Sequence, residues 1–402
     1  MDVKASRNPP FRAEHLGSLL RTDELLQKRA AVDKGTASAA ELEPLEDRDI
    51  REIVDLQRKL GFHGITDGEY RRHMFWGSFW PGLEGMTELK NPEPETFRPY
   101  LPDVAAFTEK GYRPGESVIC TGKIKHVGST YLKELDYLKS LVPADDVKSL
   151  KLTLPAPNWY HLRYKEGRAY PKHVYPSDDE FFADVAKAYQ TELQLLYDAG
   201  LRNVQIDDPN LAYFCSESML AGWKADPLNK GSADELLDAY IELYNDCLSK
   251  RPADMHVGLH ICRGNFVNSR HFSEGGYDRI ATRLFKKLNV DTYYLEYDTP
   301  RAGGFEPLVH VPKGKNVIVG VITSKFPELE EEAEMRRRVL KAAEFMARGS
   351  GESVEEALDR LGLSPQCGFA SHSSGNAVDR GDMVNKLKLV RRVADSLWPG
   401  QP

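Results

Sequence analysis

Short β-rich runs alternate with long amphipathic helical runs through most of this chain, and no other feature of the sequence limits the fold as strongly. Parallel neighbouring strands cannot be joined by a tight turn, so this alternation predicts a parallel sheet with helical crossovers. We expect eight strands, at residues 11–15, 64–67, 151–154, 203–207, 256–260, 292–296, 316–321 and 366–369. Eight is the strand number of a (β/α)8 TIM barrel, which is the fold class we predict.

Six helical patterns separate these strands, and some carry start and stop signals. Ser177 precedes the carboxylate of Glu180 by three residues, which is typical of a capping box, and Gly200 stands where the same helix should end. The six expected helices span residues 40–60, 178–199, 233–250, 277–287, 328–347 and 382–397.

The stretch from about residue 80 to 150 fits neither period, because it is rich in proline, glycine and charge. We interpret it as an elaborated insertion between the second and third barrel strands, with residues 116–124 as one arm of a hairpin. The sequence shows no internal repeat, so we predict one catalytic TIM barrel over residues 1–402.

Composition excludes several classes of function. The formal net charge of -7, without a basic stripe, argues against nucleic acid as a partner. The apolar runs are strand-sized and far short of the ~20 residues of a membrane span, and the first twenty residues do not resemble a secretion signal. We therefore expect a cytoplasmic protein. Five thinly spread cysteines do not fit a disulfide scaffold, which leaves some of them available as ligands.

A His-x-Cys pair stands at the end of the fifth expected strand. His260 and Cys262 are two residues apart, and strand geometry points such side chains to the same face. An isolated pair of this kind is more often a core histidine beside a buried cysteine. The alternative is that the pair supplies imidazole and thiolate to a metal ion.

Two later residues favour the metal. Glu296 and Cys367 lie at the ends of two further expected strands, and a barrel delivers such ends to one rim. Two thiolates select Zn²⁺ over Mg²⁺ or Ca²⁺. With the carboxylate included, the charges sum to -1, which suits activation of a bound thiol better than activation of water. Four protein ligands usually indicate a structural zinc, but such sites use closely spaced cysteine pairs, and this chain has no C-x-x-C.

These residues resemble the catalytic barrel of the cobalamin-independent methionine synthase family, and its short single-barrel relatives most of all. The resemblance is carried by four motifs, namely His260-x-Cys262, Glu296, Ser-Pro-Gln-Cys367-Gly and Gln205-Ile-Asp-Asp-Pro209. It implies a zinc ion held by His260, Cys262, Glu296 and Cys367. It also implies homocysteine as the thiol and a 5-methyltetrahydrofolate-type methyl donor.

The same resemblance implies further binding residues. Leu16-Gly17-Ser18 resembles the segment that holds the amino-acid carboxylate, while Glu69 and Asp207 resemble the carboxylates that hold the ammonium group. The alternative for Glu69 is a surface charge. For the pair Asp207 and Asp208 it is a solvated strand end or a helix cap.

Four other residues complete the predicted site. His15 either bonds the substrate or fills the barrel floor, and Trp159 either faces the pterin ring or packs. Arg263 pairs with an anionic tail or with Glu296. Lys325 stands where the long members of this family, which have an additional N-terminal barrel, carry a histidine, and we count it with Asp207 as catalytic. A lysine with an ordinary pKa of about 10.4 is, however, a poor acid at neutral pH.

The function we predict is zinc-dependent methyl transfer to homocysteine. The first alternative is a zinc-thiolate transferase or lyase that uses another thiol and another electrophile, such as an epoxide or a secondary metabolite. The second is a non-catalytic zinc-binding barrel. The oligomeric state is left open.

Overall fold

A six-stranded parallel sheet forms the centre of the computed structural model, which describes residues 11–90, 92–109 and 117–402. Its strands follow chain order: β3 (Lys151–Pro155), β4 (Asn203–Asp207), β5 (His256–Ile261), β6 (Thr292–Glu296), β7 (Asn316–Ile322) and β8 (Leu361–Pro365). Five of the six agree with the expected strands within one residue. The parallel sheet with helical crossovers is therefore confirmed.

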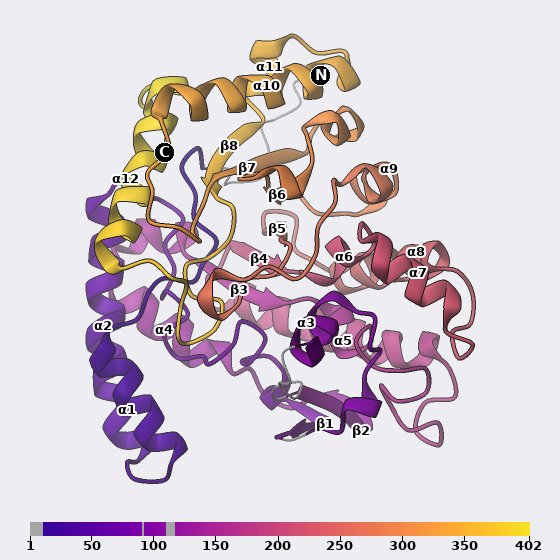
Figure 1. The fold of residues 1–402 in the computed structure, drawn as a ribbon. Helices are drawn as coiled ribbons and strands as arrows, with labels where there is room; N and C mark the ends of the chain where they lie inside the picture. Colours follow the sequence, from indigo (N-terminus) through magenta and orange to yellow (C-terminus); the bar gives the residue numbers. More distant parts are fainter. Residues whose placement is uncertain (1–10, 91, 110–116) are drawn as a thin grey trace.

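Helices surround this sheet on several sides, as Figure 1 shows for α2, α5, α8, α9, α10 and α12. Ser177 Oγ accepts from the Glu180 amide at the start of α5, and Gly200 follows its end with φ 104°, as predicted. The helices are α1 (Asp23–Asp33), α2 (Ala39–Lys59), α3 (Pro102–Glu109), α4 (Tyr131–Ser140), α5 (Asp178–Asp198), α6 (Asn210–Tyr213), α7 (Glu217–Ala225), α8 (Ala233–Leu248), α9 (Asp278–Lys287), α10 (Glu332–Ser350), α11 (Val354–Leu358) and α12 (Arg380–Leu397).

Three expected strands differ from the structure. Residues 11–15 and 64–67 contribute single parallel bridges, Ala13 to Leu363 of β8 and Ile65 to Leu150 beside β3. The prediction of a strand at 366–369 was wrong, because the paired run is 361–365. Pro365 has no N–H to donate, and the chain beyond it turns into a loop after one last bond from the Gln366 amide to the Ile322 carbonyl, at 2.8 Å.

The segment between residues 83 and 126 adds a two-stranded antiparallel sheet, β1 (Leu83–Leu89) and β2 (Ser117–His126). Figure 1 shows this pair below the six-stranded sheet. The expected hairpin arm at 116–124 matches β2 from residue 117 onward, while Glu116 lies outside the described residues.

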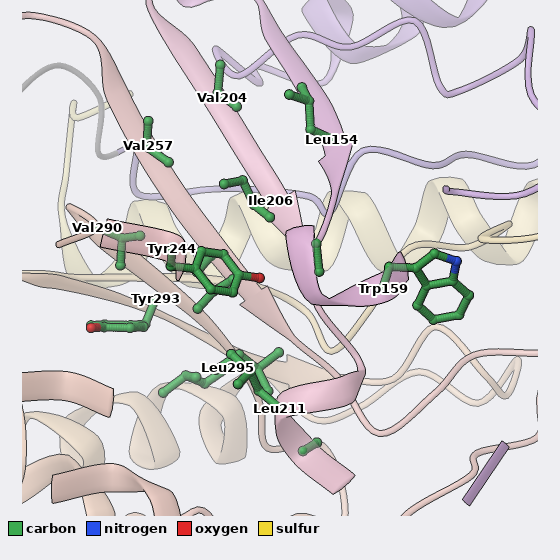
Figure 2. Close-up of a cluster of buried hydrophobic side chains, with 14 of the residues drawn as sticks. Leu154, Trp159, Val204, Ile206, Leu211, Tyr244, Val257, Val290, Tyr293 and Leu295 are labelled. Carbon is green, nitrogen blue, oxygen red and sulfur yellow. The ribbon is translucent and has the colours of Figure 1, made fainter. Parts of the chain in front are cut away.

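The sheet has two chemically different faces because side chains alternate along each strand. One face is apolar and packs against the helices: Figure 2 shows Leu154, Ile206, Val257 and Leu295 with Tyr244 of α8. The other face is polar. On it His256 bonds Asn203 and Thr292 at 3.0 and 2.7 Å, tying three strands together. At the carboxyl ends of the strands the same face carries Asp207, His260 and Glu296.

No helix of the described residues is long and apolar enough to cross a membrane.

Candidate active site

A histidine and two cysteines converge at the carboxyl end of the sheet. His260 lies in β5, Cys262 directly follows that strand, and Cys367 lies two residues beyond β8. Their ligand atoms all lie within 4.8 Å of one another, and all three side chains are buried. The Nδ1–H of His260 donates to the Tyr294 carbonyl at 3.1 Å, which turns Nε2 toward the Cys367 sulfur at 3.4 Å.

The two sulfurs form an acid–base pair. Their mutual hydrogen bond lowers the pKa of the Cys367 thiol well below its usual range and raises the pKa of Cys262. Burial lowers the pKa of His260, but the Cys367 sulfur and Asp207 outweigh burial and raise it to about 9. A buried group of imidazole and sulfur donors with thiolate character fits a zinc ion.

Glu296 does not join this group. It ends β6 with a fully buried carboxylate, but both of its oxygens are bound by the protein. Oε1 accepts from Arg301 and Oε2 accepts from the backbone amide of Arg263 at 2.9 Å. The structure therefore brings together three of the four predicted metal ligands.

A cavity of about 570 Å³ opens beside the His260, Cys262 and Cys367 side chains, and it is also lined by Glu69, Asp207 and Ser18. Burial raises the pKa of Asp207 to about 7, with Glu69 adding to the rise and His260 opposing it. Burial also raises the pKa of Glu69. Two buried carboxylates with raised pKa values beside one cavity favour a bound cation, because a positive charge stabilises their ionised forms.

Glu69 is held in an unusual backbone conformation. Its φ of 61° lies in the left-handed region, which costs a non-glycine residue about 1 kcal/mol or more. Its amide donates to Asp67 Oδ1 at 2.8 Å, and its Oε1 accepts from the Thr153 hydroxyl at 2.8 Å. Glu69 is only 2% exposed, so it is not a surface charge.

The neighbouring Asp207 and Asp208 have different environments. Asp208 accepts from Tyr244 and Asn158, each at 2.7 Å, and from the Leu211 amide at the start of α6. It is therefore a structural cap. Asp207 faces the cavity, and its Oδ1 accepts from the Gln205 side-chain amide at 2.7 Å.

The Leu16-Gly17-Ser18 turn packs against Glu69 and Thr153. Gly17 has φ 97°, and a Cβ there would stand 2.5 Å from Thr153 Cγ2 and 2.9 Å from Glu69 Oε1, so only glycine fits. His15 supports this turn and is not a lining residue of the cavity. Its Nδ1 accepts from the Gly17 amide at 3.3 Å while Nε2 bonds Gln57 at 2.9 Å.

Two other predicted residues hold loops. The Arg263 guanidinium donates to the carbonyls of Gly275, Ala302 and Glu296, and the Arg263 amide donates to the Glu296 carboxylate, so Arg263 contacts Glu296 as one of the two alternatives expected. Lys325 directs its ammonium at three acceptors: Gly264 O at 3.1 Å, Asn265 Oδ1 at 2.8 Å and Arg270 O at 3.2 Å. All three N–H donors of Lys325 are used, which gives no support to its role as a proton donor.

Aromatic rings form the remaining wall of the cavity. Trp159 lines it and also packs against Phe75 and Trp76 at ring distances of 5.0 and 6.2 Å. Sequence reasoning missed the other contributors. Three phenylalanines pack together at 5.1 to 5.8 Å and also line the cavity, namely Phe107 of α3, Phe266 and Phe272.

A parallel α/β sheet with a cavity at the carboxyl ends of its strands is typical of an α/β enzyme, and the buried thiols and imidazole there form a candidate metal site. Comparison with known proteins identifies the family. The model of the cobalamin-independent synthase catalytic domain matches residues 172–395, which is more than half of the chain. This chain belongs to the cobalamin-independent methionine synthase family.

Its relatives include both short and long proteins. The uncharacterized protein YxjG of Bacillus subtilis is 35% identical over 98% of this chain and 96% of its own length. A 5-methyltetrahydropteroyltriglutamate–homocysteine methyltransferase of Thermotoga petrophila is 25% identical over 64% of this chain, but only 30% of that longer protein is covered. A structure from Listeria monocytogenes, presented as a candidate vitamin-B12-independent methionine synthase, is 29% identical with a TM-score of 0.69, covering 97% of this chain and 98% of its own.

Proposed function

We propose that this chain is a zinc-dependent S-methyltransferase that converts homocysteine to methionine with a methyltetrahydrofolate-type donor. One observation carries the proposal: His260, Cys262 and Cys367 converge within 4.8 Å beside a cavity that also holds the carboxylates of Glu69 and Asp207. Family membership supports methyl transfer, and the two carboxylates support an amino-bearing thiol.

The donor set supports zinc as the metal. His260, Cys262 and Cys367 would hold Zn²⁺, because sulfur and imidazole donors suit zinc and do not suit Mg²⁺ or Ca²⁺. When bound, zinc lowers the pKa of a coordinated thiol and so supplies a nucleophilic sulfur near neutral pH.

The protein groups orient the amino acid. Glu69 and Asp207 bind its ammonium, and the hydroxyl of Ser18 is placed to bind its carboxylate. The backbone of the Gly17 turn, supported by His15, fixes the position of Ser18. With both charges held, the sulfur is directed to the His260 side of the cavity, which lowers the entropic cost of reaction.

The aromatic wall receives the donor. The cavity-lining rings of Trp159, Phe107, Phe266 and Phe272 provide apolar surface for a planar heterocycle. Lys325 positions the loop that carries Phe266. No contact of Lys325 supports the catalytic role at the leaving group that we predicted for it.

We also propose that the sheet closes into an eight-stranded barrel over a single domain. The bridges from Ala13 to β8 and from Ile65 to the residue before β3 extend the sheet at both edges. A Cβ on Gly64 would stand 2.8 Å from Glu14 Oε1, so the two added segments lie against each other.

Product analysis tests the proposal. Zinc-loaded full-length protein is incubated with homocysteine and, separately, 5-methyltetrahydrofolate, its triglutamate and S-adenosylmethionine. We expect methionine with a folate donor only. Methylation of a different thiol, or alkylation by an epoxide without any folate-dependent methionine, would instead support the alternative zinc-thiolate transferase.

A further inference from the structure

A series of three hydrogen-bonded side chains leads away from the cavity at Glu69. The Thr153 hydroxyl donates to Glu69 Oε1 at 2.8 Å, and Thr153 Oγ1 accepts from Arg72 Nη1, also at 2.8 Å. A hydroxyl can donate and accept at once, so the two bonds form together. Glu69 lines the cavity, and Thr153 of β3 connects it to a guanidinium that lies behind the cavity wall.

All three side chains are buried, so water screens their charges only weakly. Burial raises the pKa of Glu69, and the positive charge of Arg72 is the largest influence that opposes this rise. A buried carboxyl without an opposite charge nearby would take up a proton. Since a neutral carboxyl attracts an ammonium group only weakly, the charge of Arg72 matters for binding at Glu69.

A second arginine holds the backbone of the same turn. Arg21 Nη2 donates to the Glu69 carbonyl at 2.6 Å and to the Arg72 carbonyl at 2.9 Å. Arg21 also opposes the rise in the pKa of Glu69, but by less than Arg72, while Asp67 adds to the rise. The backbone of the turn is thus fixed by Arg21, and the carboxylate itself is reached through Thr153.

The other contacts of Arg72 leave the bond to Thr153 in place. The Arg72 guanidinium lies over the Tyr131 ring of α4, 5.3 Å from its centroid. Its Nη2 is 3.8 Å from Glu134 Oε2, which is beyond hydrogen-bond distance. Among the described residues, the hydrogen bond of this side chain goes to Thr153.

We propose that Arg72 and Thr153 are positioning residues that keep Glu69 charged and oriented toward the substrate ammonium, and so make the cavity selective for thiols that carry an amine. This inference rests on the proposed function. It deepens that function, because Arg72 supplies the counter-charge and the Thr153 hydroxyl fixes the carboxylate, although neither residue touches the substrate.

The two branches of the Thr153 side chain have separate contacts. The hydroxyl bonds Glu69 and Arg72, whereas the methyl group faces Gly17, where an added Cβ would stand 2.5 Å from Thr153 Cγ2. Thr153→Val keeps the methyl group and removes the hydroxyl. Thr153→Ser keeps the hydroxyl and removes the methyl group. The two variants therefore separate the hydrogen-bonded series from packing against the Gly17 turn.

Calorimetric binding to the full-length protein tests the inference with two ligands that lack a thiol. The ligands are methionine and 4-(methylsulfanyl)butanoate, which has no amine. Thr153→Val should weaken methionine binding about 2- to 10-fold, the effect of one buried hydrogen bond, and Thr153→Ser should restore most of the affinity. Arg72→Met should weaken it about tenfold or more. The affinity for the amine-free ligand should change little in each variant.

A double variant shows whether Arg72 acts through Glu69. Once Glu69→Gln has removed the charge, adding Arg72→Met should cost little more methionine affinity, because residues that act as one unit are not additive. Thr292→Val is the matched control. Thr292 is a buried threonine of β6 that bonds His256 at 2.7 Å, away from the cavity, and its loss should leave both affinities unchanged.

Equal losses for the two ligands would overturn the inference, as would wild-type affinity in Arg72→Met or additive losses in the double variant. Should Arg72→Met fail to fold, the contrast between Thr153→Val and Thr153→Ser still decides. Failure of the proposed function is distinguishable, because Glu69→Gln alone would then leave methionine binding unchanged.

Discussion

The cavity has two walls that are built in different ways. The metal wall consists of His260, Cys262 and Cys367, which lie on or within two residues of β5 and β8. The aromatic wall consists of Trp159, Phe107, Phe266 and Phe272, and none of these residues lies in a strand. Strand register fixes the first wall, while loops and α3 form the second. Under the proposed function, the rigid sheet therefore holds the reacting sulfur, while the second substrate binds segments that vary easily.

The largest effect should come from the metal wall. Cys262→Ser and Cys367→Ser each remove a soft ligand, so zinc affinity should fall by more than about 100-fold and turnover should be lost with it. Zinc content after dialysis, together with methionine formation, measures both. Cys120→Ser is the matched control, because a hydroxyl can keep the bond from this buried side chain to the Gly122 carbonyl. Full zinc retention in both ligand variants would remove the metal wall as defined here.

The next largest effect should come from the carboxylates, which belong to neither wall. Glu69→Gln should weaken homocysteine binding about 10- to 150-fold, the value of one charge-assisted bond of 1.5–3 kcal/mol. Binding of 4-mercaptobutyrate, which lacks the amine, should change little. Glu134→Gln is the control, because Glu134 is a buried carboxylate near Arg72 that does not line the cavity. Equal losses for both thiols would contradict ammonium binding by Glu69.

A smaller effect follows from the raised pKa of Asp207, which is about 7. A carboxyl with this pKa is mostly neutral at pH 6 and mostly charged at pH 8. Affinity for methionine, whose ammonium is charged throughout, should therefore rise about tenfold between these values. Calorimetric titration measures it, and Asp207→Asn should flatten the dependence. A flat profile in the wild type would show that Asp207 does not meet the ammonium.

The smallest effect should come from the aromatic wall. Trp159→Leu removes a ring contact of about 0.5–1.5 kcal/mol, so the KM for the folate donor should rise about 2- to 12-fold. The KM for homocysteine and the zinc content should stay the same. Steady-state kinetics with each substrate varied in turn distinguishes the two walls, and a rise in the homocysteine KM would mean that they are not separable.

The sequence predicted the metal wall well, because alternate residues of a strand point to the same face, and this places His260 and Cys262 side by side at the end of β5. It also predicted the cavity-facing carboxylates Glu69 and Asp207. It failed where contacts come from loops: nothing in the spacing of Phe107 or Phe272 indicates that they meet. Glu296 bonds Arg301 and the Arg263 amide in the structure, and no periodic pattern in the sequence indicates these contacts.

The loop after β5 joins the two walls with almost no intervening chain. It begins at Cys262, carries Phe266 and is tied to Lys325 at both ends, through Gly264 and Arg270. A molecule that contacts Phe266 therefore contacts a short loop that Lys325 holds in place and that begins at Cys262, one of the candidate metal ligands. Under the proposed function, a methyl donor that docks on Phe266 would contact the same short loop that carries Cys262, which favours ordered addition of the two substrates.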